Sequence, residues 1–377
     1  MTAPKRSMQY WSASIVGAAL VLAFLAIGGH LGTFGIRYFF DPHDIGVYFE
    51  SSRWIVEGGT LYGDVFSEYP LLANAIFAAI RWIANTTFPG SRGFEYLWVL
   101  TAAVVYAFAT IRVAAFASFL AATAWLAPAS IYFALFRYDV YPAVAMLFGL
   151  LAIRREGYTA GAIWLGIALA LKGYALFMLP ALCVFVLHRR GLVAAVRVTI
   201  IAIAPMITSF AVVYAVAGWE GVTSPFRFHL GREFNWESSY DALNYVLGTE
   251  LQATQIPFVP LALQALASLA AAGMRPRSFD DLVNATIFAI VGYVTFSVFY
   301  SPQFLLWLLP IVSFANSRMM IVLAVLLAWV TYAYFPVAWD LTHIIGVPPK
   351  LLQALVVTVT ALRVSMMIVS VRNVYRS

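Results

Sequence analysis

Residues 139–172 read DVYPAVAMLFGLLAIRREGYTAGAIWLGIALALK, and this stretch decides the fold. Two apolar runs flank the basic turn Arg154-Arg155-Glu156, and their far ends are the ionisable residues Asp139 and Lys172. A helix rises 1.5 Å per residue, so each run spans only about 21 Å, whereas the hydrocarbon core of a bilayer is about 30 Å thick. The pattern predicts two short membrane helices that stop below one surface of the bilayer.

Asp139 and Lys172 are therefore expected to lie recessed at membrane depth. An ionisable residue at that depth needs a partner or a water-filled cavity. A cluster of Arg137, Asp139 and Lys172 that only holds helix ends together would satisfy this requirement. We favour the other interpretation, an externally open cavity flanked by charges of both signs.

The composition extends this interpretation to the whole chain. Of 377 residues, 63% are hydrophobic and 11% are charged, whereas soluble domains have roughly 45–50% and about 25%. The 11 Trp and 20 Tyr suit aromatic belts at two membrane interfaces. Cys183 is the single cysteine, which excludes an intrachain disulfide or a cysteine metal site. The sequence predicts an all-α polytopic membrane protein.

Apolar runs of membrane-spanning length predict twelve transmembrane helices with both termini in the cytoplasm. The first run follows Lys5 and Arg6 and is too long for the core of a signal peptide, so we expect it to be retained. The predicted spans are residues 11–34, 96–111, 113–135, 141–153, 158–171, 175–187, 192–217, 256–273, 283–299, 304–315, 319–335 and 351–371.

The stretch 71–88 is also apolar, and the positive-inside rule decides its place. If it does not cross the membrane, the cytoplasmic side receives twelve basic residues against Glu156, Asp280 and Asp281. These basic residues are Lys5, Arg6, Arg112, Arg154, Arg155, Arg189, Arg190, Arg275, Arg277, Arg318, Arg372 and Arg376. We therefore expect 71–88 to be a juxtamembrane helix on the external side. The net charge of +6 then indicates orientation and not a nucleic-acid partner.

Most acidic residues then fall on the external side, chiefly in two long polar loops, residues 35–95 and 218–254. They are Asp41, Asp44, Glu50, Glu57, Asp64, Glu68, Glu95, Asp139, Glu220, Glu233, Glu237, Asp241, Glu250 and Asp340. Loops of this length usually carry function.

An external cavity cut into the bilayer suits a substrate that is half lipid, such as a sugar linked to a polyprenyl phosphate. Sugar transfer needs a carboxylate as general base and cations that stabilise the leaving phosphate. Asp44 is the candidate base, although an Asp at that position is also a good helix N-cap, and Asp41 before Pro42 suits a turn. The candidate cations are Arg137, Lys172, His229 and Arg232. No motif indicates a metal site or a cofactor.

Five motifs in order resemble glycosyltransferase family 87, within the GT-C superfamily. The first loop carries Asp44-Ile-Gly-Val-Tyr48 with Arg53, then Gly58-Gly-Thr-Leu-Tyr62, then Glu68-Tyr69-Pro70-Leu71. The others are Arg137-Tyr-Asp139, Leu171-Lys172-Gly-Tyr174, Phe228-His229 with Arg232 and Glu237-Ser238, and Ser301-Pro-Gln303-Phe-Leu-Leu-Trp307. In this family two prolines often follow the tyrosine of the first loop, and a proline often follows the lysine, whereas Leu71 and Gly173 stand here.

The resemblance implies a membrane enzyme that moves a hexose, often mannose, from a polyprenyl-phosphate donor to a lipid or glycan acceptor, with inversion. It implies a catalytic GT-C module of seven helices in residues 1–217, followed by an external loop and further membrane helices in residues 218–377. Asp44 would be the base. The expected substrate-binding residues are Asp41, Tyr48, Arg53, Glu68, Tyr69, Arg137, Asp139, Lys172, His229, Arg232, Glu237 and Gln303.

A secondary transporter with about twelve helices is the main alternative, and a non-catalytic lipid-binding protein is a further one. Transporters place ionisable residues near the midplane in paired halves, whereas the polar residues here gather on one side. Arg363 in the last predicted span is the strongest observation for a transporter, although its long side chain could snorkel to the interface.

Overall fold

The chain folds into helices throughout residues 41–376, which is the part that the computed structural model describes. The first half contains α2 (His43–Ser51), α3 (Trp54–Glu57), α4 (Leu71–Thr87), α5 (Ser91–Ala114), α6 (Phe119–Trp125), α7 (Pro128–Phe136), α8 (Val140–Arg154), α9 (Tyr158–Leu171), η2 (Gly173–Met178), α10 (Leu179–Arg190) and α11 (Leu192–Leu230). The second half contains α12 (Ser239–Leu247), η3 (Ala253–Gln255), α13 (Val259–Gly273), α14 (Phe279–Thr295), η4 (Pro302–Phe304), α15 (Leu305–Val312), α16 (Arg318–Tyr332), η5 (Ala333–Ala338), α17 (Trp339–His343) and α18 (Lys350–Val374).

Several of these helices can cross a membrane. Within residues 41–376, five segments are long and apolar enough, and a sixth results if the bent pair α6 and α7 forms one span. Four shorter apolar helices accompany them, among them α8 and α9. The predicted all-α membrane fold is therefore supported. The count of twelve spans stays a prediction, and its first span, residues 11–34, lies outside the described residues.

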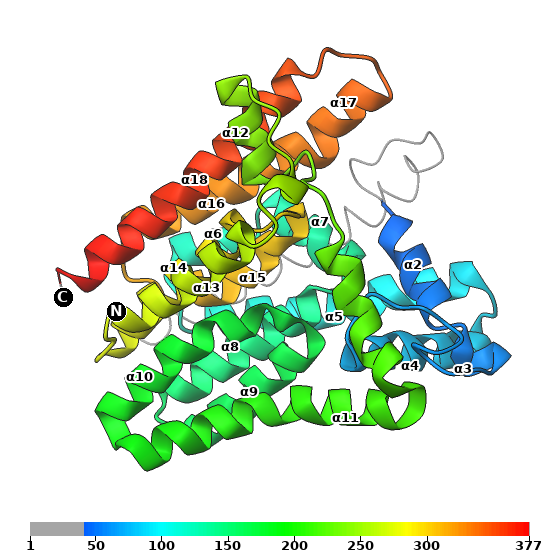
Figure 1. The fold of residues 1–377 in the computed structure, drawn as a ribbon, viewed down its shortest axis with the longest axis horizontal. Coiled ribbons are helices and arrows are strands. Elements are labelled where there is room, and N and C mark those ends of the chain that lie inside the picture. Colours follow the sequence, from blue (N-terminus) through cyan, green and yellow to red (C-terminus); the bar gives the residue numbers. More distant parts are fainter. Residues whose placement is uncertain (1–40, 377) are drawn as a thin grey trace, which may run out of the picture.

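The helices form two groups that meet along α8, α10 and α15 (Figure 1). In one group α8, α9, α10 and α11 pack side by side, and in the other α13, α14, α16 and α18 do so. At one end of the molecule, α2, α3 and α4 gather beside the last part of α11 (Figure 1). This end brings the two long polar loops, residues 35–95 and 218–254, together within the described residues.

Glycines allow the close approach of α8, α9 and α11. A Cβ atom on Gly161 would lie 2.5 Å from Ile153 of α8, and one on Gly166 would lie 2.8 Å from the carbonyl oxygen of Ala202 in α11. Small residues are the usual means by which membrane helices pack backbone to backbone. α8 and α9 have 15 and 14 residues, as short as their apolar runs predict.

In three segments the structure adds detail that the sequence prediction lacked. The predicted span 113–135 is divided between α5, α6 and α7, with a bend of 45° between α6 and α7. The predicted span 192–217 continues as α11 through a break at Gly218, whose φ of 65° is non-helical, to Leu230. The apolar stretch 71–88 forms the helix α4, which is not among the candidate spans.

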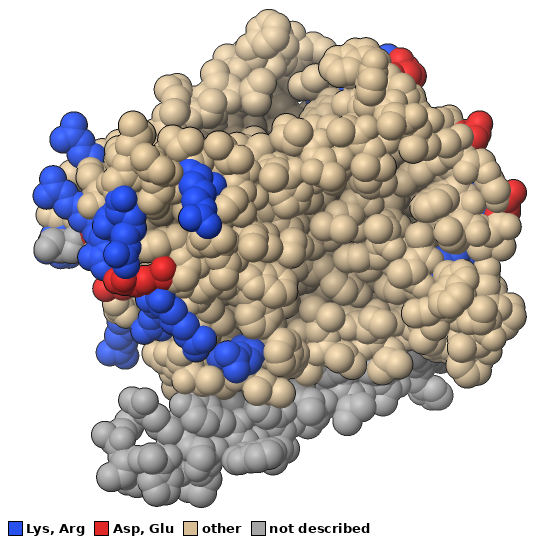
Figure 2. Space-filling model, turned by 90° about the horizontal axis from the view of Figure 1, so that it is seen from below, with Lys and Arg blue, Asp and Glu red and all other residues tan. Residues whose placement is uncertain are grey.

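Charge is segregated along the long axis of the molecule. Figure 2 shows Lys and Arg side chains gathered at one end of this face, and Asp and Glu side chains at the opposite end. At the turns between α8 and α9 and between α10 and α11, the exposed Glu156 bridges Arg189 and Arg190. This segregation is the pattern on which the positive-inside assignment rests.

The glycine contact between α9 and α11 leads to a stability prediction. Replacing Gly166 by valine should force the two backbones apart, because the Ala202 carbonyl cannot move as a side chain would. We expect Gly166→Val to cost about 1–3 kcal/mol of stability, seen as a lower thermal midpoint of the detergent-solubilised protein. Gly273→Ala, where an added Cβ meets nothing within 4 Å, is the control. Equal midpoints for the two variants would contradict the packing argument.

Candidate functional site

Asp139 and Lys172, the two ends of the short helices, form an ion pair. Lys172 follows α9 and places its Nζ 2.7 Å from Asp139 Oδ1, just before α8. Trp307 of α15 donates its Nε1–H to the same oxygen, also at 2.7 Å. Asp139 is fully buried, whereas the Lys172 side chain remains 18% exposed. Asp139 thus holds the Lys172 ammonium group in place, and that group remains partly accessible to solvent.

Aromatic rings surround the Lys172 ammonium. Its Nζ lies 4.4 Å from the ring centre of Tyr138, 5.1 Å from that of Trp307 and 5.3 Å from that of Phe304. Ring faces attract a cation and exclude water around it. The result is a positive charge in an apolar setting, where its attraction for an anion is stronger than in water.

Arg137 holds the start of the first loop. Its Nη2 lies 2.6 Å from Asp41 Oδ2, and its Nε lies 3.0 Å from Asp44 Oδ2. The Arg137 and Asp41 side chains are 5% and 3% exposed, whereas that of Asp44 is 21% exposed. Asp44 is therefore the carboxylate of this cluster that a bound molecule can reach.

Asp44 is not the N-cap of α2, which was the alternative role that the sequence left open for it. The N-cap position of α2 is Pro42, and Asp44 lies inside the first turn. Asp41 accepts the backbone N–H of His43 at 3.2 Å, which is the turn-forming role expected for an Asp before proline. The carboxylate of Asp44 is thereby left to pair with Arg137 and to face the open side.

The second long loop contacts the first through Glu68. Its carboxylate lies 2.6 Å from Arg232 Nη2, and its carbonyl oxygen lies 3.3 Å from His229 Nε2. Phe228 also packs its ring against Phe66, with centres 5.5 Å apart. Sequence segments 160 residues apart thus meet over one end of α2.

Tyr48 and Tyr69 lie on the inner side of this cluster. Tyr48 is fully buried, and its hydroxyl oxygen accepts the backbone N–H of Tyr138 at 3.2 Å. The Tyr69 ring packs against Tyr48 and Tyr138, with centres 5.4 Å and 5.2 Å away. Tyr48 therefore fixes α2 against the Arg137–Asp139 turn from within the core.

The remaining predicted residues take no part in the ion pairs of Arg137 and Lys172. Glu237 is buried, and its Oε2 accepts a hydrogen bond from Asn235 Nδ2 at 3.0 Å. Gln303 of η4 accepts the hydroxyl of Ser301. Arg53 lies on the outer side of the first loop and lines a cavity with Glu68 and Tyr69.

Arg363 does not snorkel to the interface, which corrects the sequence expectation. It is fully buried, with its guanidinium 4.0 Å from the ring centre of Tyr300. Its Nη2 donates to Ser239 Oγ at 3.1 Å and to Thr360 Oγ1 at 2.8 Å. The last helix is therefore tied to the second long loop.

The sequence did not indicate which aromatic residues contact Asp139 and Lys172. Trp307 and Tyr138 both lie inside motifs that the sequence showed, yet neither was expected to contact Lys172 or Asp139. Asn235 was also missed, although its side chain joins Glu237 to the backbone of Tyr300. Within residues 41–376, no group of three or more His, Cys, Asp or Glu side chains is arranged to hold a metal ion.

Comparison with known protein families identifies a match over much of the chain. The family model described as mannosyltransferase (PIG-M) matches residues 138–345, more than half of the chain. The matched region includes Asp139, Lys172, His229, Arg232, Glu237 and Gln303, whereas Asp41, Asp44 and Arg137 precede it. No curated protein matches the chain. The match supports a GT-C-like mannosyltransferase, whereas the assignment to family 87 stays a prediction.

Burial of Glu237 leads to a pH prediction. Burial raises the pKa of this carboxyl well above its usual 4.5, against the opposing effect of Arg137 and Arg363. Because the folded state holds the proton more tightly than the unfolded state, the stability contributed by Glu237 is complete below about pH 4.5 and declines as the pH rises through the raised pKa. We expect the thermal midpoint of Glu237→Gln, relative to that of wild type, to increase from pH 5 to pH 9. A difference that does not change with pH would contradict this assignment.

Proposed function

The chain belongs to the mannosyltransferase (PIG-M) family and is a membrane glycosyltransferase, and from this premise we propose that it transfers mannose from a polyprenyl-phosphate donor to a hydroxyl group of a lipid or glycan acceptor at the external face. Asp44 is the general base in this proposal, and the sugar is transferred with inversion. The observation that carries it is the placement of one accessible carboxylate, Asp44, beside a group of recessed cations on the same side of the helix bundle.

The accessible carboxylate suits proton abstraction. In the proposed step, Asp44 takes the proton of the acceptor hydroxyl as that oxygen forms a bond to the anomeric carbon of mannose. The bond between the anomeric carbon and the phosphate oxygen breaks, and the polyprenyl phosphate leaves with the electron pair. Arg137 orients Asp44, since its Nε lies 3.0 Å from Asp44 Oδ2.

Lys172 is the proposed contact for the leaving phosphate. Its ammonium is 18% exposed, and the rings of Tyr138, Trp307 and Phe304 keep water from its other sides. A cation in such a setting stabilises negative charge that develops on the phosphate oxygen. His229 and Arg232 lie on the second loop, where they can meet the phosphate or the sugar from the opposite side.

The shortness of α8 and α9 suits a lipid-linked donor. Both helices end at the recessed pair of Asp139 and Lys172, so a phosphate held there lies close to the hydrocarbon in which a polyprenyl tail dissolves. The charge segregation along the long axis supports an arrangement with both termini cytoplasmic and the site external, in the plasma or inner membrane. Residues 1–217 form the catalytic module in this proposal, and residues 218–377 add the second loop and the remaining helices.

Asp44→Asn is the decisive variant. The amide keeps the shape of the side chain but cannot take a proton, so transfer should fall at least about 100-fold. The measurement is incorporation of labelled mannose from polyprenyl-phosphate mannose into lipid acceptors by the purified protein in lipid. Arg137 keeps its pair with Asp41 in this variant, so we expect a near-normal thermal midpoint.

Asp64→Asn is the matched control in the same loop. Asp64 is exposed and its carboxylate binds Thr60 at 2.7 Å, away from the cluster. This control should retain wild-type transfer. Full activity of Asp44→Asn would remove Asp44 as the base. Movement of a solute across the bilayer without any glycosylated product would instead favour the transporter.

A further inference from the structure

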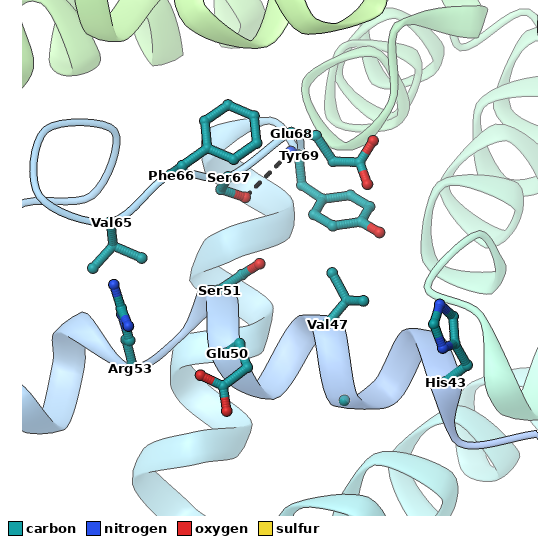
Figure 3. A pocket seen from close by; sticks show the side chains of 11 residues that line it. His43, Val47, Glu50, Ser51, Arg53, Val65, Phe66, Ser67, Glu68 and Tyr69 are labelled. Carbon is teal, nitrogen blue, oxygen red and sulfur yellow. Dashed lines mark hydrogen bonds between the residues drawn. The ribbon is translucent and has the colours of Figure 1, made fainter. Parts of the chain in front are cut away.

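A cavity of about 490 Å³ lies on the outer side of α2, apart from the cluster around Lys172. One wall is α2 with Arg53, two residues beyond its end, and the other is the segment Val65–Tyr69 of the same loop (Figure 3). The second wall is held in shape from within, because Ser67 Oγ accepts the N–H of Tyr69 at 3.2 Å and donates to Asn74 Oδ1 at 3.0 Å. Its size falls within the roughly 300–1,000 Å³ of typical ligand sites.

The face of α2 that lines the cavity borders Asp44. His43, Val47 and Glu50 recur at the spacing of one helix face, and Ser51 lines the cavity beside them. Asp44 lies seven residues, or about two turns, before Ser51 and so on the same line along the helix. The opposite face of α2 is buried through Ile45 and Tyr48. Asp44 is thus at the edge between the cavity and the Arg137 cluster.

The polar groups of the cavity do not match a phosphate. Glu50 and Arg53 are both exposed, and neither has an ion-pair partner within residues 41–376. Glu68 adds a second carboxylate, but it is paired with Arg232, so the charges around the cavity balance and offer a phosphate no excess of cations. By contrast, the cluster that is proposed to bind the donor contains the cations Arg137 and Lys172.

The same groups match the hydroxyl groups and the C–H faces of a sugar. Carboxylates accept hydrogen bonds from sugar hydroxyls, and guanidinium groups donate hydrogen bonds to them. Val47 and Tyr69 provide apolar surface between the two walls, whereas the Phe66 ring, 53% exposed, points away from α2 toward Phe228 (Figure 3). Gly46 leaves the α2 wall open, because a Cβ there would meet nothing within 4 Å.

We propose that this cavity binds the acceptor, and that the acceptor presents a neutral or weakly charged sugar headgroup to it. Glu50 and Arg53 bind the hydroxyls of this headgroup, while Val47 and Tyr69 provide the apolar surface beside its ring. The acceptor hydroxyl then reaches Asp44 from the cavity side, and the donor reaches it from the Lys172 side. The role of the cavity as an acceptor site rests on the proposed transferase function, whereas its affinity for a sugar can be measured without turnover.

A thiol-protection experiment tests sugar binding. Cys183 is the single cysteine, so Cys183→Ala with Phe66→Cys places one reactive thiol in the cavity. The protein in lipid nanodiscs is labelled with a maleimide in the presence of octyl α-D-mannopyranoside, octanol or decaprenyl phosphate. We expect the mannoside to slow labelling about tenfold, as about nine-tenths occupancy would do, and octanol and decaprenyl phosphate to have no effect.

Two matched controls make the result specific. Phe88→Cys in the same background is exposed at the end of α4 and outside the cavity, so the mannoside should not protect it. Adding Glu50→Gln to Phe66→Cys should remove most of the protection, whereas adding Glu57→Gln, an exposed carboxylate outside the cavity, should not.

Several results would overturn the inference. These are unchanged labelling of Phe66→Cys with the mannoside, equal slowing at Phe88→Cys, protection by octanol or decaprenyl phosphate, and protection that survives Glu50→Gln. If the protein transfers mannose but shows no protection, the proposed function stands and the acceptor site is wrong. If protection is specific but mannose is never transferred, the cavity still binds sugar, whereas the transferase proposal and the acceptor role fail together.

Discussion

Buried charge shared between distant parts of the chain is the constraint on which the site depends. Arg137 lies at the turn before α8, and its two acidic partners, Asp41 and Asp44, come from the first loop. A buried charge that loses its partner costs about 3–5 kcal/mol, so the loop cannot leave the helix bundle without exposing or stranding a charge. The pair of Asp139 and Lys172 does the same for the ends of α8 and α9. Electrostatic compensation thus sets the position of every polar group nearby.

The sequence predicted those parts of the fold that depend on run length and flanking charge. The bounds of α8 and α9 agree with the apolar runs between Asp139 and Lys172, because only two short helices can fill that stretch. Hydropathy did not reveal the bend between α6 and α7 or the break at Gly218, because a kink leaves the apolar content of a segment unchanged. Arg363 was misjudged because the ring that receives its guanidinium, Tyr300, is remote in sequence.

The same limit applies to the site. Charged residues are scarce in this chain, so their positions drew attention to Arg137, Asp139 and Lys172. Aromatic residues make up 16% of the sequence, and most of them serve packing or the membrane interface, so the motifs that contain Trp307 and Tyr138 did not reveal their contacts with Asp139 and Lys172. The pairing of Glu68 with Arg232 likewise depends on the path of α11 after Gly218, which no local pattern encodes.

The two faces of α2 have different freedom to change during evolution. Ile45 and Tyr48 are locked into the core, and a substitution there would disturb the Arg137 turn. His43, Val47 and Glu50 touch only the cavity side, where new side chains meet open space instead of packed atoms. In the proposed enzyme, substitutions on this face therefore change which acceptor enters the cavity while the Arg137 cluster keeps its geometry, so one short helix allows a lineage to diversify its products without rebuilding its chemistry.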